Sequence, residues 1–275
     1  MKKRIFRGFT LAVINDCRDA HAVKRQESRL HASLMKVGII APITFVGVEH
    51  DFEAAFNLID QMDAIGGECP GGIATNVARR NGDAHKYDNG TKFCCFQYKK
   101  IWNIATIEGV TLSLVKKLHL VESLFVIHMD HAVASMVQDG FIPDSSASEI
   151  VNSQFRSFDF SPRALAYVLG GKKLCCTELP IQSIVPDSQP IIAVIDCFGN
   201  GKTMVLAKEL NLVNGSVQTK FGKLSFYKRL ADVPDNTAAI IQGSSGLPGF
   251  RFAEIVINGE SAAEKFGFKI GDRIF

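Results

Sequence analysis

Residues 190–205, with the sequence PIIAVIDCFGNGKTMV, constrain the fold of this chain more than any other stretch. An apolar run ends at Asp196, a Phe-Gly-Asn-Gly segment follows, and a second apolar run begins after Lys202 and Thr203. Because glycine and asparagine favour tight turns, the pattern predicts a strand, a loop and a second strand. Polar groups at the end of a buried strand, with an aromatic ring beside them, indicate a ligand site.

Each side chain of this loop suits one kind of contact. Asp196 can hold a cation or an ammonium group, Phe198 can stack on a flat ring, and Asn200 offers a donor and an acceptor to a base edge. An ordinary turn with a solvated aspartate is the alternative. A phosphate-binding loop is excluded, because its first glycine would stand at position 196, which is Asp.

The composition is that of a globular protein with a sizeable core. The chain has 275 residues, 47% hydrophobic and 21% charged, with a net charge of +3, so neither nucleic acid nor a membrane is an expected partner. The seven cysteines are odd in number and form no Cys-x-x-Cys motif, which favours reduced thiols in a cytoplasm. The basic start at residues 1–5 is not followed by a credible secretion signal, and no run reaches membrane-spanning length.

The first two-thirds of the chain alternates strand, polar turn and helix. Residues 9–14 and 37–48 are predicted strands, and residues 20–36 and 54–62 are predicted helices. This rhythm predicts an α/β domain, a Rossmann-like mixed sheet with helices, over residues 1–185. Asp16 or Asp19 could hold a ribose diol at the end of the first strand, but a helix cap is the favoured interpretation.

The later segments change character. We expect a hairpin over 93–107, a helix over 109–118, a strand over 121–127 and a helix over 161–169. Prolines in 178–190 indicate a linker. Short apolar runs separated by turns then predict a small all-β, barrel-like domain over 186–275. His128, Asp130 and His131 lack further ligands nearby in the sequence, so we expect no metal.

The order of these motifs resembles the family of S-adenosylmethionine (SAM) hydroxide adenosyltransferases and the related chlorinases and fluorinases. The first strand ends near an aspartate, Asp16, and an Asp-x-Phe-Gly-Asn signature with a following threonine opens the C-terminal domain. Near the end, a Gly-Ser-Ser-Gly turn at 243–246, a strand ending at Asn258-Gly259 and a small-residue segment from Ser261 follow in the family's order. The chain departs from the family in the middle, where it has no Asp-Pro-Gly and has Phe155-Arg156-Ser157 in place of Phe-His-Gly.

The resemblance implies a reaction and a set of roles. Water attacks the ribose C5′ of SAM and gives adenosine and methionine; attack by chloride, or binding without catalysis, are the alternatives. Arg79, Arg80, Arg156 and Ser157 are the candidates near the nucleophile. The candidates for binding SAM are Asp16, His50, Asp51, Asp196, Phe198, Asn200, Ser244, Ser245, Ile257, Asn258 and Gly259. The resemblance also implies a homotrimer with sites between subunits, no cofactor beyond SAM as substrate, and no metal.

Overall fold

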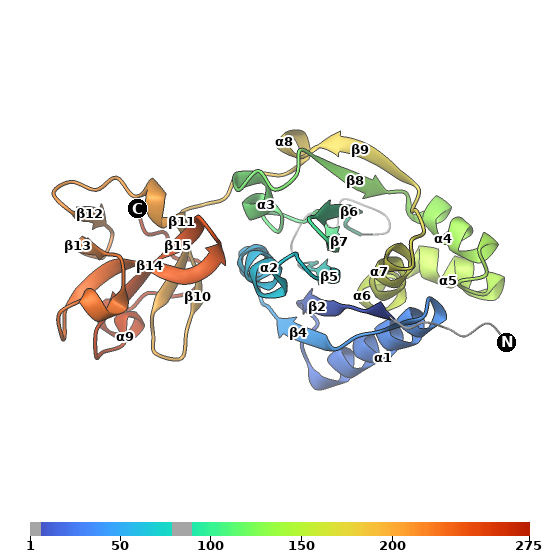
Figure 1. Cartoon of the computed structure of the whole chain (residues 1–275), viewed down its shortest axis with the longest axis horizontal. Coiled ribbons are helices and arrows are strands. Elements are labelled where there is room, and N and C mark those ends of the chain that lie inside the picture. Colours follow the sequence, from blue (N-terminus) through green and yellow to red (C-terminus); the bar gives the residue numbers. More distant parts are fainter. Residues whose placement is uncertain (1–6, 79–89) are drawn as a thin grey trace. The chain divides into compact units, whose positions relative to one another are not determined.

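The computed structural model describes residues 7–78 and 90–275, and the chain divides into two compact units, Met1–Pro186 and Asp187–Phe275. Each unit is built around its own sheet (Figure 1). In the described parts of the chain, no helix combines the length and the apolar character needed to cross a bilayer.

The N-terminal unit contains a seven-stranded mixed sheet in the order β4-β2-β5-β7-β6-β8-β9. Its first four strands are parallel, β6 is antiparallel to β7 and β8, and β8 is antiparallel to β9. A separate parallel pair joins β1 (Arg7–Gly8) to β3 (Ile39–Ile40). The strands of the main sheet are β2 (Thr10–Asn15), β4 (Ile43–Gly47), β5 (Gly71–Asn76), β6 (Phe93–Tyr98), β7 (Ile101–Thr106), β8 (Ser123–Ile127) and β9 (Cys176–Pro180).

Helices cover both faces of this sheet because its central strands are apolar on both sides (Figure 1). Leu11 and Val13 of β2 face a core shared with α1 and α7, whereas α2 packs on β2 and β5 and also contacts α3. The helices are α1 (Ala20–Lys36), α2 (Asp51–Ile65), α3 (Ser113–Lys117), α4 (Met129–Gln138), η2 (Asp144–Ser146), α5 (Ala147–Asn152), α6 (Arg156–Asp159), α7 (Ser161–Leu169) and α8 (Ile181–Ile184).

The C-terminal unit is a six-stranded sheet in the order β10-β11-β15-β14-β13-β12. All neighbours are antiparallel except β13 and β14. Ile240 and Ile255 lie in its core, against which Phe268 packs. The elements are β10 (Ile192–Ile195), β11 (Gly201–Leu206), η3 (Ala207–Glu209), β12 (Ser216–Thr219), β13 (Gly222–Tyr227), η4 (Leu230–Asp232), β14 (Ala238–Leu247), β15 (Phe250–Ile257) and α9 (Ala262–Phe266).

The structure confirms the predicted fold class, an α/β sheet followed by an all-β unit. The strand–loop–strand prediction for 190–205 corresponds to β10, the loop 196–200 and β11. The helix predicted over 161–169 is α7, with Pro162 in its first turn. Pro42 divides the strand predicted over 37–48 into β3 and β4.

Two local predictions are wrong, and a third is wrong in part. Gly109 has a φ of +46°, outside the helical range, so the helix expected from 109 begins only at Ser113. The expected linker 178–190 contains the boundary between the two units after Pro186, but its first half is the end of edge strand β9 and the helix α8. The expected turn at 243–246 lies within β14 at a shift in register, and the hairpin instead turns at Pro248 and Gly249.

Candidate functional site

The carboxyl ends of the parallel strands β4, β2, β5 and β7 meet at one edge of the N-terminal sheet, where α/β proteins usually bind ligands. Asp16 follows β2 directly. Its Oδ2 accepts a hydrogen bond from the Ala78 N–H at 2.8 Å, and its own N–H donates to the Asn76 carbonyl at 3.3 Å. These contacts fix the Asp16 carboxylate at the sheet edge.

The buried side chain of Asn15 stabilises the turn after β2 by hydrogen bonds. Asn15 Nδ2 donates to Gln26 Oε1 of α1 at 2.6 Å, and Asn15 Oδ1 accepts from the Cys17 N–H at 2.8 Å. Asp19 caps α1 by accepting from the Ala22 N–H at 3.0 Å, and this backbone hydrogen bond lowers the pKa of Asp19. The favoured cap interpretation is therefore confirmed for Asp19.

The fold brings Ser157 of α6 to this edge. Desolvation of the thiol and then the charge of Asp16 raise the pKa of Cys17, whereas a hydrogen bond with the Ser157 hydroxyl lowers it. Arg156 precedes Ser157, and its guanidinium lies 5.3 Å from the centroid of the Phe93 ring. Burial lowers the pKa of Arg156. A desolvated cation and a hydroxyl thus reach the edge from one short turn.

His50 and Asp51 start α2 at the same edge. Asp51 is only 4% exposed; its Oδ1 accepts from the Phe52 N–H and its Oδ2 from the Val110 N–H, each at 3.0 Å. A Cβ on Gly109 would lie 2.0 Å from Asp51 Oδ2. Asp51 therefore anchors the segment after β7, while the ring of His50 lies 4.8 Å from that of Phe52.

Sequence reasoning missed a second buried carboxylate near this edge. Glu108 comes two residues after β7, is 3% exposed, and accepts a hydrogen bond from the Thr91 hydroxyl. An acidic residue two positions after an apolar strand was the available signal. Arg79 and Arg80, predicted near the nucleophile, lie outside the described residues.

The predicted loop of the C-terminal unit is closed by its own aspartate. Asp196 Oδ1 accepts from the N–H groups of Phe198 at 2.9 Å and Asn200 at 3.0 Å, and Oδ2 accepts from Asn200 Nδ2 at 3.1 Å. A carboxylate has about four acceptor positions, so at least one direction stays available for a ligand. One amide N–H of Asn200 is thereby used within the loop, and the residue is 8% exposed.

Phe198 projects from this closed loop with 75% of its surface exposed. The loop also packs against the start of α9: the Gly199 carbonyl accepts from the Ala263 N–H at 2.9 Å, and a Cβ on Gly199 would lie 2.0 Å from Ser261 Oγ. The candidates Asp196, Phe198 and Asn200 therefore lie near the turn that follows Ile257.

The other C-terminal candidates have separate positions. Asn258 Nδ2 donates to the Val233 carbonyl at 2.8 Å and to Asp235 Oδ1 at 3.1 Å, so its side chain holds the preceding loop. Ser244 and Ser245 lie opposite the first half of β15, whereas Gly201 pairs with Ile255. Three positions along a strand correspond to about 10 Å, so the serines lie about that far along the sheet from the Asp196 loop.

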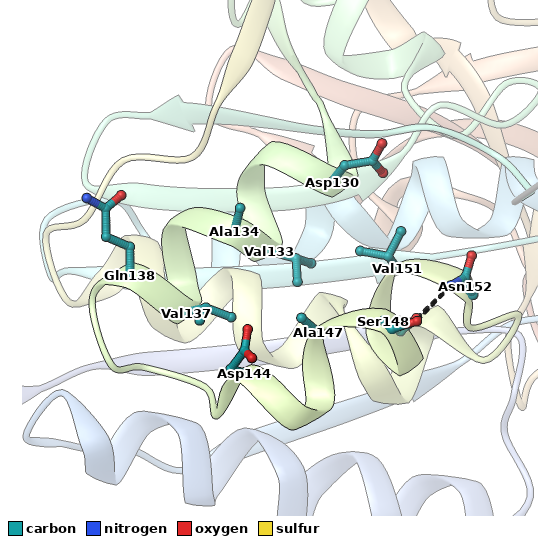
Figure 2. A pocket seen from close by; sticks show the side chains of 10 residues that line it. All are labelled: Asp130, Val133, Ala134, Val137, Gln138, Asp144, Ala147, Ser148, Val151 and Asn152. Atoms are coloured by element: carbon teal, nitrogen blue, oxygen red, sulfur yellow. Dashed lines mark hydrogen bonds between the residues drawn. The ribbon is translucent and has the colours of Figure 1, made fainter.

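The structure also has clefts away from the predicted residues. Figure 2 shows one of about 440 Å³ between α4 and α5, with Val133, Val137 and Val151 on its walls and Asp130 and Asp144 at its rim. None of the predicted site residues lines it. Within residues 7–78 and 90–275, no three His, Cys, Asp or Glu side chains gather closely enough to hold a metal ion.

The geometry defines a two-unit protein with a polar edge on an α/β sheet and an aromatic loop on an all-β sheet. Residues 191–275 match the family model described as the SAM hydroxide adenosyltransferase C-terminal domain. The family resemblance predicted from the sequence is therefore confirmed over the C-terminal unit.

Two solved structures share the fold over nearly the whole chain. An uncharacterized conserved protein from Thermotoga maritima aligns with a TM-score of 0.65 and 17% identity, covering 95% of this chain and 98% of that one. A conserved hypothetical protein from Thermus thermophilus aligns with a TM-score of 0.60 and 15% identity, covering 97% and 100%. At such identities the likeness shows the fold alone. No curated protein matched this chain.

Proposed function

We propose that this protein binds SAM and hydrolyses it to adenosine and L-methionine, with water attacking the ribose C5′. The observation that carries the proposal is the loop 196–200, which lies within the matched domain and presents the exposed ring of Phe198 on a hydrogen-bonded frame. A rigid, exposed aromatic ring suits stacking on adenine, because stacking then requires little ordering of the protein.

In this proposal each candidate has one role. Asp196 accepts a hydrogen bond from the ammonium group of the methionine part through the carboxylate lone pair that the loop leaves available. Phe198, Asn200 and the backbone of Ile257–Gly259 bind adenine. Asp16 binds the ribose hydroxyls. The methionine carboxylate is bound by Ser244 and Ser245, where Ser244 is exposed and Ser245 is buried. His50 and Asp51 shape the edge beside Asp16 through α2.

The chemical step needs orientation and desolvation more than a strong base. The water oxygen forms a bond to C5′, the bond between C5′ and the sulfonium sulfur breaks, its electron pair stays on methionine, and a proton is released to solvent. Arg156 stays protonated at neutral pH despite its lowered pKa, so it orients water or stabilises hydroxide. Ser157 lies beside Arg156 and is the second candidate near the nucleophile. Arg79 and Arg80 are assigned to the same group because of the family resemblance alone. Catalysis then comes from positioning and from the removal of solvent.

Attack by chloride is the second candidate, and the partly desolvated Arg156 favours it because a half-buried guanidinium attracts a small anion. Purified protein incubated with SAM, with and without chloride, distinguishes the candidates by mass spectrometry of the products. We expect adenosine and methionine in both conditions. A 5′-chloro product would establish the halogenase. Tight SAM binding without any product would leave a binding protein and exclude the enzyme.

Arg156→Ala tests the role of the cation. Because its contact matters mainly in the transition state, turnover should fall about 10²-fold while the Kd for SAM changes little. Arg229→Ala is the charge-matched control, since Arg229 is exposed in the C-terminal unit and pairs with Asp232. Equal turnover in both variants would remove Arg156 from the mechanism.

The assembly and location belong to the same proposal. We propose a homotrimer in the cytoplasm that needs no cofactor besides its substrate SAM, and no metal. Light scattering should give three times the chain mass of 30.1 kDa. Dialysis against a chelator should leave the turnover of SAM unchanged.

A further inference from the structure

A cleft of about 640 Å³ lies along α1 from Ala20 to Ala32, and no residue assigned a role in the proposed reaction lines it. Its charged lining is cationic, and no aspartate or glutamate lines it. The lining residues are Ala20, His21, Lys24, Arg25, Ser28, Arg29, Ala32 and Phe158. A cleft with this lining is complementary to an anion.

Two arginines share one aromatic ring in this cleft. Arg25 and Arg29 belong to α1, and Phe158 belongs to α6, which packs on α1. The guanidinium carbons of Arg25 and Arg29 lie 4.1 Å and 4.2 Å from the centroid of the Phe158 ring. Each guanidinium is attracted to the ring, and the ring fixes both side chains in position. Both guanidinium groups are therefore held at one aromatic ring before any ligand arrives.

These arginines have no carboxylate partner within residues 7–78 and 90–275. Like charges four residues apart on a helix repel each other. Lys24 is partly neutralised by Glu27 at 2.7 Å, but no such pairing offsets Arg25 or Arg29. An oxyanion bound in this cleft would offset the uncompensated positive charge of both arginines.

We propose that the Arg25–Arg29–Phe158 cleft binds a phosphate group, free or as the monoester of a small molecule. Planar guanidinium groups donate paired hydrogen bonds that match the oxygens of a tetrahedral oxyanion. His21 lies in the first turn of α1, where the partial positive charge of the helix terminus also favours an anion. The apolar wall of Ala20 and Ala32 leaves room for the organic part of a monoester.

Isothermal titration calorimetry on the full chain tests the proposal, with inorganic phosphate and with glycerol phosphate at constant ionic strength set by sodium chloride. Wild-type protein should bind one equivalent of phosphate. Arg25→Gln and Arg29→Gln should each weaken binding at least about tenfold, because each removes a charged donor. Arg25→Lys should also weaken binding, since an ammonium group lacks the paired donors.

Arg18→Gln is the control, because it removes the same charge nearby from a side chain that pairs with Glu49 and does not line the cleft. Its phosphate affinity should equal that of the wild type. Glycerol phosphate binding as tightly as phosphate, or more tightly, would identify a monoester site, and weaker binding would identify a site for the free ion. Absence of binding by wild-type protein, or equal losses in Arg18→Gln and Arg25→Gln, would overturn the proposal. SAM binding is measured in parallel, so failure of this site is distinguishable from failure of the proposed reaction.

Discussion

The loop Asp196–Asn200 and the sheet edge around Asp16 both centre on an aspartate after a strand, but they are held together differently. Asp196 is fixed by three hydrogen bonds from residues no more than four positions away. Asp16 is fixed by the N–H of Ala78, 62 positions away, and its neighbour Cys17 contacts Ser157 of α6. The aspartate of the first region is held within its own loop, which then packs on the start of α9, whereas the second region is assembled by the tertiary fold.

The difference between the two regions has a consequence for stability. The loop depends on local backbone geometry, so changing one residue should disturb it strongly. The Asp16 edge distributes its contacts over β2, β5 and α6, so each contact contributes less. The following three experiments examine this contrast.

Gly199→Ala should have the largest effect on the loop. Gly199 has a φ of +80°, and its new Cβ would lie 2.0 Å from Ser261 Oγ, so left-handed strain and overpacking add. We expect a loss of about 2–5 kcal/mol in the free energy of unfolding, measured with urea. Gly215→Ala is the matched control, because Gly215 has a φ of +73° and nothing within 4 Å of the added Cβ. Equal losses in both variants would show that the contact with Ser261 does not matter.

Asp196→Ala and Asp16→Ala compare the two aspartates directly. Asp196→Ala leaves the three donors of its loop without their acceptor and should lower the free energy of unfolding by about 1.5–3 kcal/mol. Asp16→Ala removes one recorded backbone hydrogen bond and should lower it by about 1 kcal/mol. Denaturant unfolding of both variants measures the difference. A larger loss in the free energy of unfolding for Asp16→Ala than for Asp196→Ala would contradict this prediction.

The reactivity of Cys17 should show the smallest effect, a few-fold change in alkylation rate. Asp16 raises the pKa of Cys17, so Asp16→Asn should lower that pKa, increase the thiolate fraction near pH 8 and speed alkylation. Ser157→Ala should act in the opposite direction, because the Ser157 hydrogen bond lowers the pKa. Mass spectrometry of iodoacetamide-treated protein resolves each cysteine, and the exposed Cys197 serves as the internal control. Unchanged Cys17 rates in both variants would contradict the contact at this edge.

The sequence predicted elements whose signals are local. The β10–loop–β11 hairpin, the Asp19 cap and α7 with Pro162 each depend on residues within one or two turns of each other. Interactions between residues that are close in the sequence can be predicted without the tertiary structure.

Tertiary structure decided what depends on distant partners. Edge strand β9 could not be predicted from a segment that begins at its last residues and includes Pro180, because only pairing with β8 satisfies its backbone groups. The bulge at 243–246 exists because β14 must stay paired with β15 on both sides of the shift in register. Buried Asp51 and Glu108, and the approach of Ser157 to Cys17, likewise follow from packing between segments far apart in the chain. Local sequence determined the turns, caps and hairpin, because their hydrogen bonds close over a few residues, whereas the Asp16 edge required the whole sheet, because its partners meet only after the strands have paired.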